Sequence, residues 1–289
     1  MVSIIIPYYN RISDVSRAVD SVFSQSYVDW ELFLIDDCST ESSEILRQYT
    51  KGPNGQRVHH RWNTNNMGPG YSRNRGIKEA VGEYLVFLDS DDVLNSEYLE
   101  KMVSEMAPDL LFVYCSAAWK DGTIYKNSNE SFSVVLPTLF RFGRPWHTVS
   151  VLWNKMHVPY FNEHLRAWED YLFEFEAGLK NNKILHLNEV LVVIGSADKL
   201  SLSNQAGTTA GWRDNIKAID LMLLQLELNS FWKNLGLTRL LLLKHIHFSV
   251  RLKQFDKENN IEFKSRILRV FPRNVLALKV LRKCLRIVK

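Results

Sequence analysis

The segment YLVFLDSDD at residues 84–92 joins a short apolar run to a cluster that contains three aspartates. A continuous apolar run of this length is typical of a strand that is buried on both faces of a sheet. A similar arrangement occurs at residues 31–37, where the apolar run LFLI is followed by Asp36 and Asp37. The sequence therefore places acidic side chains directly after two predicted strands.

Strands and helices alternate on both sides of these two segments. Further strands are predicted at residues 2–6 (ended by Pro7), 58–62, 110–115, 123–125 and 190–194. Helices are predicted from a cap at Ser13, at 42–49, at 72–80, from a cap at Ser96 to about 106, and at 169–179. This alternation is typical of βαβ units. We therefore expect an α/β fold with a mainly parallel sheet, in which ligands bind at the carboxyl ends of the strands.

The composition excludes several classes of protein. With 46% hydrophobic and 24% charged residues, the chain is neither disordered nor fibrous. No window holds about 18 uncharged apolar residues, so no transmembrane helix is expected, and the N-terminus is predicted to be a strand and not a signal peptide. The cysteines Cys38, Cys115 and Cys284 are too far apart for a disulfide framework or a zinc site, and they favour a reducing cytoplasm.

The end of the chain is basic. Residues 239–289 hold 14 Lys and Arg against 3 Asp and Glu, whereas the other 238 residues hold 22 against 29. The chain after residue 203 is predicted to be helical, with interruptions at residues 256–260 and at Pro272. A basic helix with an apolar face is typical of docking on an anionic membrane, and the acidic body argues against nucleic acid. The alternative is that the apolar face packs on the rest of the chain.

The cluster after residue 88 is a candidate metal site. Asp89 and Asp91 alternate, so that their oxygens can converge on one hard cation, which can bridge two phosphates. The alternative is a solvated acidic turn that caps the next helix. An EF-hand is excluded, because Leu94 stands where that loop needs glycine. Among the eight histidines, His147 and His157 are the candidates for a third ligand.

Three other segments have residues suited to a ligand. A carboxylate at Asp37 can accept a hydrogen bond from a base N–H such as N3–H of uracil, or it can belong to a capped turn. The segment at 68–76, GPGYSRNRG, offers a helix N-terminus and Arg73 to a phosphate, but it matches neither a Walker loop nor a dinucleotide fingerprint. In WED at 168–170, the indole can stack on a sugar and an acid can accept a hydroxyl proton. The alternative is a helix first turn that favours acids.

Together and in this order, these segments resemble the inverting GT-A glycosyltransferases of family 2, of the bacterial surface-polysaccharide type. The resemblance covers about residues 1–195, and the last third carries no motif of that family. The segments that carry it are VSIIIPYYN at 2–10, LIDDCST at 34–40, GPGYSRNRG at 68–76 with Ser72 where alanine is usual, FLDSDD at 87–92, WNK at 153–155 and WED at 168–170.

The resemblance implies a GT-A fold, that is, a Rossmann-like nucleotide-binding sheet flanked by helices. The catalytic domain would span residues 1–205, with a nucleotide-binding half at 1–115 and an acceptor-binding half at 116–205. A helical, basic C-terminal extension would span 206–289. A UDP-sugar donor, Mn²⁺ or Mg²⁺, and inversion at the anomeric carbon are also implied, with transfer to a saccharide acceptor that we expect to be lipid-linked, as in O-antigen or capsule synthesis.

The resemblance also implies roles for individual residues. Inversion by one displacement needs a single base on the face opposite the leaving group, and the resemblance makes Asp170 that base, with Glu169 beside it. Asp91 would hold the metal with Asp89, which also lies by the ribose and diphosphate, and Asp92 has a less defined role. The expected nucleotide-sugar contacts are Pro7, Tyr9, Asp37, Arg73, Asp89 and Ser90, and the expected acceptor contacts are Trp168 and Trp153.

Two other functions remain open on the sequence alone. One is a catalytically weak scaffold of the same fold docked on a membrane, against which the intact Asp91 and Asp170 argue. The other is a sugar-phosphate nucleotidyltransferase, which normally has a Gly-rich basic loop where this chain has Pro7 to Arg11. With the basic tail, the leading interpretation predicts a cytoplasmic enzyme that is peripheral on the inner face of the cell membrane.

Overall fold

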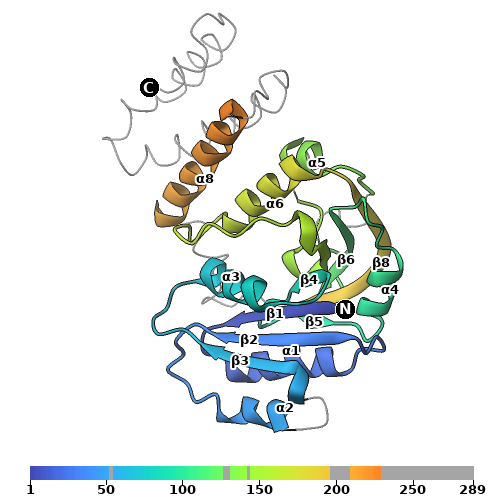
Figure 1. Cartoon of the computed structure of the whole chain (residues 1–289), viewed down its shortest axis with the longest axis vertical. Coiled ribbons are helices and arrows are strands. Elements are labelled where there is room, and N and C mark those ends of the chain that lie inside the picture. The colour runs from blue at the N-terminus through green and yellow to red at the C-terminus, as the bar shows by residue number, and fades with distance from the viewer. Residues whose placement is uncertain (52–54, 126–130, 142–143, 196–208, 229–289) are drawn as a thin grey trace, which may run out of the picture.

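The computed structural model describes residues 1–51, 55–125, 131–141, 144–195 and 209–228, and it has the α/β architecture expected (Figure 1). Within these residues, eight strands form one sheet in the order β3-β2-β1-β4-β7-β6-β8-β5. The strands are β1 (Val2–Tyr8), β2 (Trp30–Asp36), β3 (Val58–Trp62), β4 (Tyr84–Phe87), β5 (Val93–Leu94), β6 (Phe112–Trp119), β7 (Val151–Asn154) and β8 (Ile184–Ile194).

Helices cover both faces of this sheet. The longer ones are α1 (Ile12–Phe23), α3 (Pro69–Glu79), α4 (Tyr98–Ser104), α5 (Val135–Arg141), α6 (Glu169–Lys180) and α8 (Thr209–Leu228). Short helical segments are η1 (Glu44–Arg47), α2 (Gln48–Lys51), η2 (Gly55–Arg57), η3 (Thr148–Ser150) and η4 (Lys155–His157). The predicted helix at residues 42–49 is thus divided between η1 and α2, and the other predicted helices before residue 195 are present with shifted ends.

The strands β3, β2, β1 and β4 are parallel, as predicted for this part of the chain. The prediction that Pro7 ends the first strand is wrong, because β1 continues to Tyr8 in register with β2. The carbonyl of Ile5 points toward β4 and accepts the N–H of Leu88. Because backbone groups alternate in direction along a strand, the nitrogen of Pro7, two residues later, also faces the β4 side. Pairing with β4 has already ended there, so the missing N–H of proline costs no hydrogen bond of the sheet.

Helix α1 is capped differently from the prediction. Arg11, and not Ser13, precedes the helix, with a φ of 57°. The N–H of Ile12 donates to the Glu41 carboxylate at 3.3 Å, so the loop after β2 satisfies a donor of the first turn. Helix α4 likewise follows Glu97 and not Ser96.

The rest of the sheet contains both parallel and antiparallel pairs, whereas the sequence predicted a mainly parallel sheet. β7 is antiparallel to both β4 and β6, β8 is parallel to β6, and β5 is antiparallel to β8. The sequence did not predict β5 or β7, because two and four residues are too few for a clear periodic pattern. The strand predicted at 123–125 is only a bridge between Ala118 and Ile124, since β6 itself runs on to Trp119.

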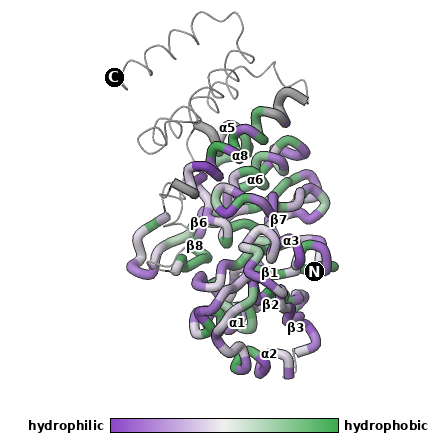
Figure 2. The backbone as a smooth tube through the Cα atoms, turned by 90° about the vertical axis from the view of Figure 1, so that its left-hand side faces the viewer, coloured by the Kyte–Doolittle hydropathy of each residue, from purple (hydrophilic) through white to green (hydrophobic). Residues whose placement is uncertain are grey.

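Alternate residues of β1 face two separate hydrophobic clusters. Ile4 and Ile6 pack into the cluster that includes α1 and α4. Ile5 packs with Phe33 and Phe87 into the cluster that includes α3 and α6. Helix α6 packs in turn on α5 and α8, and Figure 2 shows these three helices together at the end of the molecule opposite α1 and α2. The sheet is therefore covered on both faces, as its continuous apolar strands require.

The C-terminal part of the chain is described only in α8, which confirms a helix within the region predicted to be helical. The predicted interruptions and the basic segment at 239–289 lie outside the described residues. None of the described helices is long and apolar enough to cross a bilayer. The sheet runs through both predicted halves of the catalytic domain, because β7 joins β4 to β6.

Gly76 of α3 lies directly on β1. A Cβ atom added there would approach three carbons of the Ile5 side chain at 2.6–2.9 Å, whereas one added at Gly70 of the same helix would meet only ordinary contacts of 3.4 Å or more. We expect Gly76→Ala to lower the free energy of unfolding by about 1–3 kcal/mol through overpacking. Gly70→Ala is the matched control. Urea denaturation should separate the two, and equal midpoints would contradict the close packing of α3 on β1.

Candidate active site

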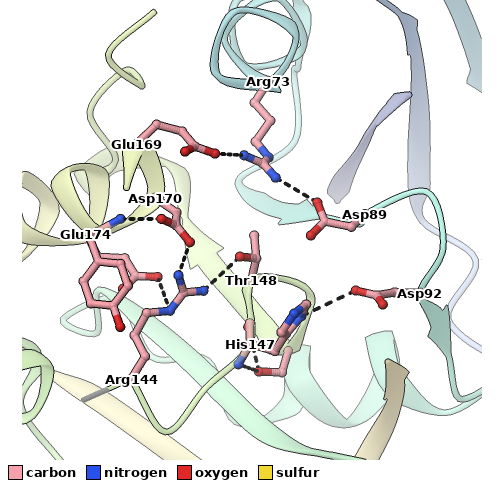
Figure 3. Close-up of polar contacts among 11 residues, drawn as sticks. Arg73, Asp89, Asp92, Arg144, His147, Thr148, Glu169, Asp170 and Glu174 are labelled. Atoms are coloured by element: carbon pink, nitrogen blue, oxygen red, sulfur yellow. Dashed lines mark hydrogen bonds and ion pairs between the residues drawn. The ribbon is translucent and has the colours of Figure 1, made fainter. Parts of the chain in front are cut away.

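The two acidic clusters lie at the same edge of the sheet, at the carboxyl ends of parallel strands, where the sequence predicts that ligands bind. β2 and β4 lie on either side of β1 and run parallel to it, so their carboxyl ends point the same way. Asp37 follows β2, and residues 89–92 follow β4. The first turn of α6 lies next to this edge, where Glu169 faces Asp89 across the side chain of Arg73 (Figure 3). The candidate site is therefore built from segments that are far apart in the sequence.

Asp37 holds the loop that enters α3. One carboxylate oxygen accepts hydrogen bonds from the Asn63 amide at 2.8 Å and the Met67 N–H at 2.9 Å. The other accepts the N–H of Gly68 at 2.7 Å. Because a carboxylate has about four acceptor positions, about one remains for a ligand. Asp37 is thus a loop anchor in this structure, and its contact with a nucleotide base stays a prediction.

A buried polar network that the sequence did not reveal supports the same edge. The Tyr8 hydroxyl donates to Asp36 at 3.1 Å and lies 2.6 Å from His60 Nε2. The other Asp36 oxygen accepts the N–H of Ser39 at 2.7 Å. Burial raises the pKa of Tyr8 and lowers the pKa of His60, which favours a neutral phenol and a neutral imidazole. The network fixes the turn after β2, and Tyr9, the residue after Tyr8, is exposed.

Three side chains, two that follow β4 and one that precedes η3, are arranged as the ligands of a metal ion would be. Ligand atoms of Asp89, Asp92 and His147 all lie within 4.8 Å of one another. Asp92 Oδ1 accepts the N–H of Gly195 at 2.8 Å, and its buried Oδ2 lies 3.4 Å from Nδ1 of His147. Burial and the charge of Asp89 raise the pKa of Asp92 well above its ordinary value. Two crowded carboxylates and an imidazole suit a divalent cation such as Mn²⁺ or Mg²⁺.

The structure places the other predicted metal ligands differently. The carboxylate of Asp91 is 3.6 Å from Arg11 Nη1 and is not one of the three clustered residues, so its metal role stays a prediction. Burial and Asp89 raise the pKa of Asp91 as well. His157 lies in η4, outside this group. Ser90, which is partly exposed, belongs to the turn between Asp89 and Asp91.

Arg73 connects this group to α6. Its Nη2 donates to Asp89 at 2.8 Å and its Nη1 donates to Glu169 at 3.1 Å, while only 6% of its side chain is exposed. The guanidinium also lies 5.3 Å from the centre of the Phe161 ring. The two carboxylates hold Arg73 in the charged form and raise its pKa against the effect of burial. Arg73 therefore joins the end of β4 to the start of the helix that carries the predicted base.

The two acidic residues that open α6 have opposite electrostatic environments. Burial and the neighbouring charge of Asp170 raise the pKa of Glu169 to about 7, although Arg73 opposes the shift. Burial also disfavours ionisation of Asp170, but Arg144 outweighs it and holds the pKa of Asp170 below its ordinary value. Asp170 is therefore the carboxylate of the pair that is fully ionised near neutral pH.

The two predicted acceptor contacts lie in different environments. Trp168 precedes α6 with a φ of 61°, is partly buried, and stacks on Tyr171 with ring centres 4.6 Å apart. Trp153 is only 2% exposed and packs against Phe112 and Phe173. The buried position makes Trp153 a core residue in this structure, which leaves Trp168 as the predicted acceptor contact on an accessible edge.

Two residues near the predicted base were not predicted from the sequence: Arg144, which donates to Asp170, and Glu174, which pairs with Arg144 (Figure 3). Arg144 belongs to a segment where the expected pattern of strands and helices is lost, so nothing in the sequence marked it. Glu174 was detectable, because it is four residues after Asp170 and therefore lies on the same helix face.

Comparison with known proteins identifies the family. The family model described as glycosyl transferase family 2 matches residues 3–167. An uncharacterized glycosyltransferase of Haemophilus influenzae is 32% identical over 224 residues, which cover 75% of this chain and 87% of that protein. A poly(ribitol-phosphate) beta-glucosyltransferase of Bacillus spizizenii is 34% identical over 193 residues, which cover 63% of this chain and 30% of that protein.

Solved structures share the fold. The crystal structure of Staphylococcus aureus TarS 1-349 in complex with UDP-GlcNAc has a TM-score of 0.67 and 21% sequence identity, and the match covers 91% of this chain and 75% of that one. At this identity the likeness establishes the GT-A fold and no more. The chain spans only 30–42% of the length of the first curated relatives that it matches. On the family match and the similarity to the Haemophilus protein, this chain belongs to glycosyl transferase family 2.

Proposed function

We propose that this protein transfers a sugar from a UDP-sugar to a hydroxyl of a saccharide acceptor, with inversion, in a single metal-assisted displacement. The observation that carries the proposal is that Arg73 connects two carboxylates, Asp89 and Glu169, which lie in different environments. Asp89 belongs to the group suited to a cation, and Glu169 is adjacent to the ionised Asp170. A donor diphosphate bound beside Asp89 and an acceptor hydroxyl bound beside Asp170 would lie on opposite sides of the sugar.

The proposed donor side consists of the carboxyl edge of β1, β2 and β4. The UDP-GlcNAc complex of TarS, whose fold this chain shares, supports a UDP-sugar as the donor here. The residues that we assign to this side are the predicted set of Pro7, Tyr9, Asp37, Arg73, Asp89 and Ser90. A bound Mn²⁺ or Mg²⁺ would be held by carboxylates after β4, with His147 within reach, and would offset the negative charge of the departing diphosphate. The complex of a Pyrobaculum calidifontis mannosyltransferase of the same fold contains Mn²⁺.

The proposed base is Asp170. Its carboxylate is ionised and 26% exposed, so it can accept the proton of an acceptor hydroxyl. As the proton leaves, the hydroxyl oxygen bonds to the anomeric carbon and the bond from that carbon to the diphosphate oxygen breaks. Glu169 remains bonded to Arg73 and keeps the donor-side guanidinium in place. No covalent enzyme intermediate is needed for inversion.

We further propose a lipid-linked acceptor in the synthesis of a bacterial surface polysaccharide, at the inner face of the cell membrane. The poly(ribitol-phosphate) glycosyltransferases among the relatives support a cell-surface polymer. The basic composition of residues 239–289 supports docking on an anionic membrane, where each Lys or Arg near the surface contributes about 1 kcal/mol. Turnover of a UDP-sugar in a donor screen would separate this function from that of a scaffold.

The metal proposal predicts that EDTA removes turnover and that Mn²⁺ restores it. Asp91→Asn should also remove turnover without unfolding the protein, because one anionic oxygen ligand is lost. Asp29→Asn is the control, because Asp29 is an exposed acid that directly precedes β2, at the end of the strand away from the candidate site. Binding of Mn²⁺ in the presence of UDP can be followed by electron paramagnetic resonance. Normal binding in Asp91→Asn but none in Asp92→Asn would place the ion on the Asp89, Asp92 and His147 group without Asp91.

The base proposal predicts that Asp170→Asn keeps the UDP dissociation constant within a few fold of wild type. Transfer should fall by about 10²–10⁴-fold, the usual contribution of a general base. Glu176→Gln changes an acid two turns further along α6, where it contacts Gln225, and should have little effect. Steady-state kinetics and UDP titration provide the two measurements. A mild effect of Asp170→Asn beside a severe effect of Glu169→Gln would reverse the two roles.

The membrane proposal predicts that the full chain sediments with vesicles of anionic lipid and is released by high salt. A chain ending near residue 260 should stay in the supernatant, because most of the basic residues are removed. Vesicles of neutral lipid serve as the control for non-specific sedimentation. Equal sedimentation of the two chains would contradict docking through the C-terminal region.

A further inference from the structure

Arg144 is a buried cation beside the proposed base. Its side chain is 6% exposed, and the guanidinium contacts three groups at once (Figure 3). Nη1 donates to Asp170 Oδ2, and Nη2 donates to the Thr148 hydroxyl at 2.9 Å. Nε is 3.3 Å from a carboxylate oxygen of Glu174. Burying a guanidinium is costly unless its partners surround it, so these contacts define one orientation of Arg144.

The two carboxylates of α6 that contact Arg144 differ in their exposure. Asp170 and Glu174 are four residues apart, so both lie on the helix face that meets Arg144. Glu174 is 3% exposed, which makes it a counter-charge inside the protein. Asp170 remains partly exposed, and its Oδ1 accepts the N–H of Tyr171 at 2.8 Å. The carboxylate of Asp170 is therefore held through both oxygens and still reachable from solvent.

We propose that Arg144 is a positioning residue, which fixes the Asp170 carboxylate in the orientation and the ionised state needed to accept the acceptor proton. The inference rests on the proposed function, in which Asp170 is the base. The guanidinium suits this task, because its other two nitrogens contact Thr148 and Glu174 and so fix the place of Nη1 against Asp170 Oδ2. Thr148 and Glu174 hold the guanidinium itself. A base whose position is fixed in this way needs no reorganisation when the acceptor arrives.

The charged surroundings of Asp170 decide how its ionisation should respond. Arg144 lies on one side and Arg73 of α3 on another, while the acidic neighbours Glu169 and Glu174 lie on its own helix. Tyr171 and Tyr125 are the phenols nearest to Arg144. Loss of Arg144 removes the main force that holds the pKa of Asp170 down, whereas burial and the acidic neighbours remain. The pKa of Asp170 should then rise. As the pH is lowered, the activity of the variant should therefore begin to decline at a higher pH than that of the wild type.

The test compares Arg144→Gln, Arg144→Lys and the control Arg61→Gln. Arg61 forms an arginine–carboxylate pair with Glu79 at 2.7 Å, on β3 and α3, away from α6. In Arg144→Gln we expect kcat to fall by about 10²-fold, as for a base displaced by about 1 Å, with no change in the UDP dissociation constant. The acidic limb of the pH profile of kcat should move to higher pH. Arg144→Lys should keep most of the limb position but recover only part of kcat, because it retains the charge and loses the fork.

Titration of ¹³C-labelled aspartate carboxyls by NMR measures the same effect without turnover. The Asp170 resonance is assigned by its loss in Asp170→Asn, and its midpoint should be higher in Arg144→Gln than in wild type or Arg61→Gln. If Arg144→Gln fails to fold because the buried Glu174 carboxylate loses its ion pair with Arg144, the double variant Arg144→Gln/Glu174→Gln removes that charge and takes its place. An unchanged midpoint, or a wild-type kcat and pH profile in a folded variant, would overturn the proposal. Lack of turnover of every UDP-sugar by the wild type would instead reject the proposed function.

Discussion

One buried guanidinium links the parts of the site that the chain brings from distant positions. Arg73 lies between Asp89, at the end of β4, and Glu169, at the start of α6. Its charge must be matched on both sides because little of it reaches water, so the distance between the strand edge and the helix is set by the size of one side chain. The packing of α3 on β1, which the absence of a side chain at Gly76 allows, carries Arg73 to that position. The sheet, the helix and the site thus depend on the same close approach.

The neighbouring pair Glu169 and Asp170 shows how the environment divides the work of two similar groups. Each carboxylate has its own arginine, Arg73 for the first and Arg144 for the second. Burial dominates for Glu169, and the ion pair dominates for Asp170, so their pKa values move in opposite directions. Separation of this kind keeps Asp170 ionised near neutral pH, as the proposed base requires, while Glu169 stays bonded to Arg73.

The sequence was sufficient for the parts of the fold that local patterns determine. The apolar runs before Asp36 and Asp89 identified two strands, and the rule that ligands bind at the carboxyl ends of parallel strands drew attention to the acidic residues that follow them. That both strands are neighbours of β1 comes from the structure. Short strands such as Val151–Asn154 were missed because four residues give no periodicity. Arg144 was missed for a different reason. Its contact with Asp170 joins residues 26 positions apart, with η3, β7 and η4 between them, and no spacing rule reports such a contact.

The order of the strands has a consequence for any attempt to build chimaeras from this family. Strand β7 comes from the second half of the chain but lies between β4 and β6, antiparallel to both. A junction near residue 115 would therefore pair β4 of one parent with β7 of the other, so that two strands with unmatched side chains would meet inside the sheet. Specificity for a new acceptor is better sought by exchanging the segments that follow the strands, with Val151–Asn154 kept together with Tyr84–Phe87, than by recombining whole halves.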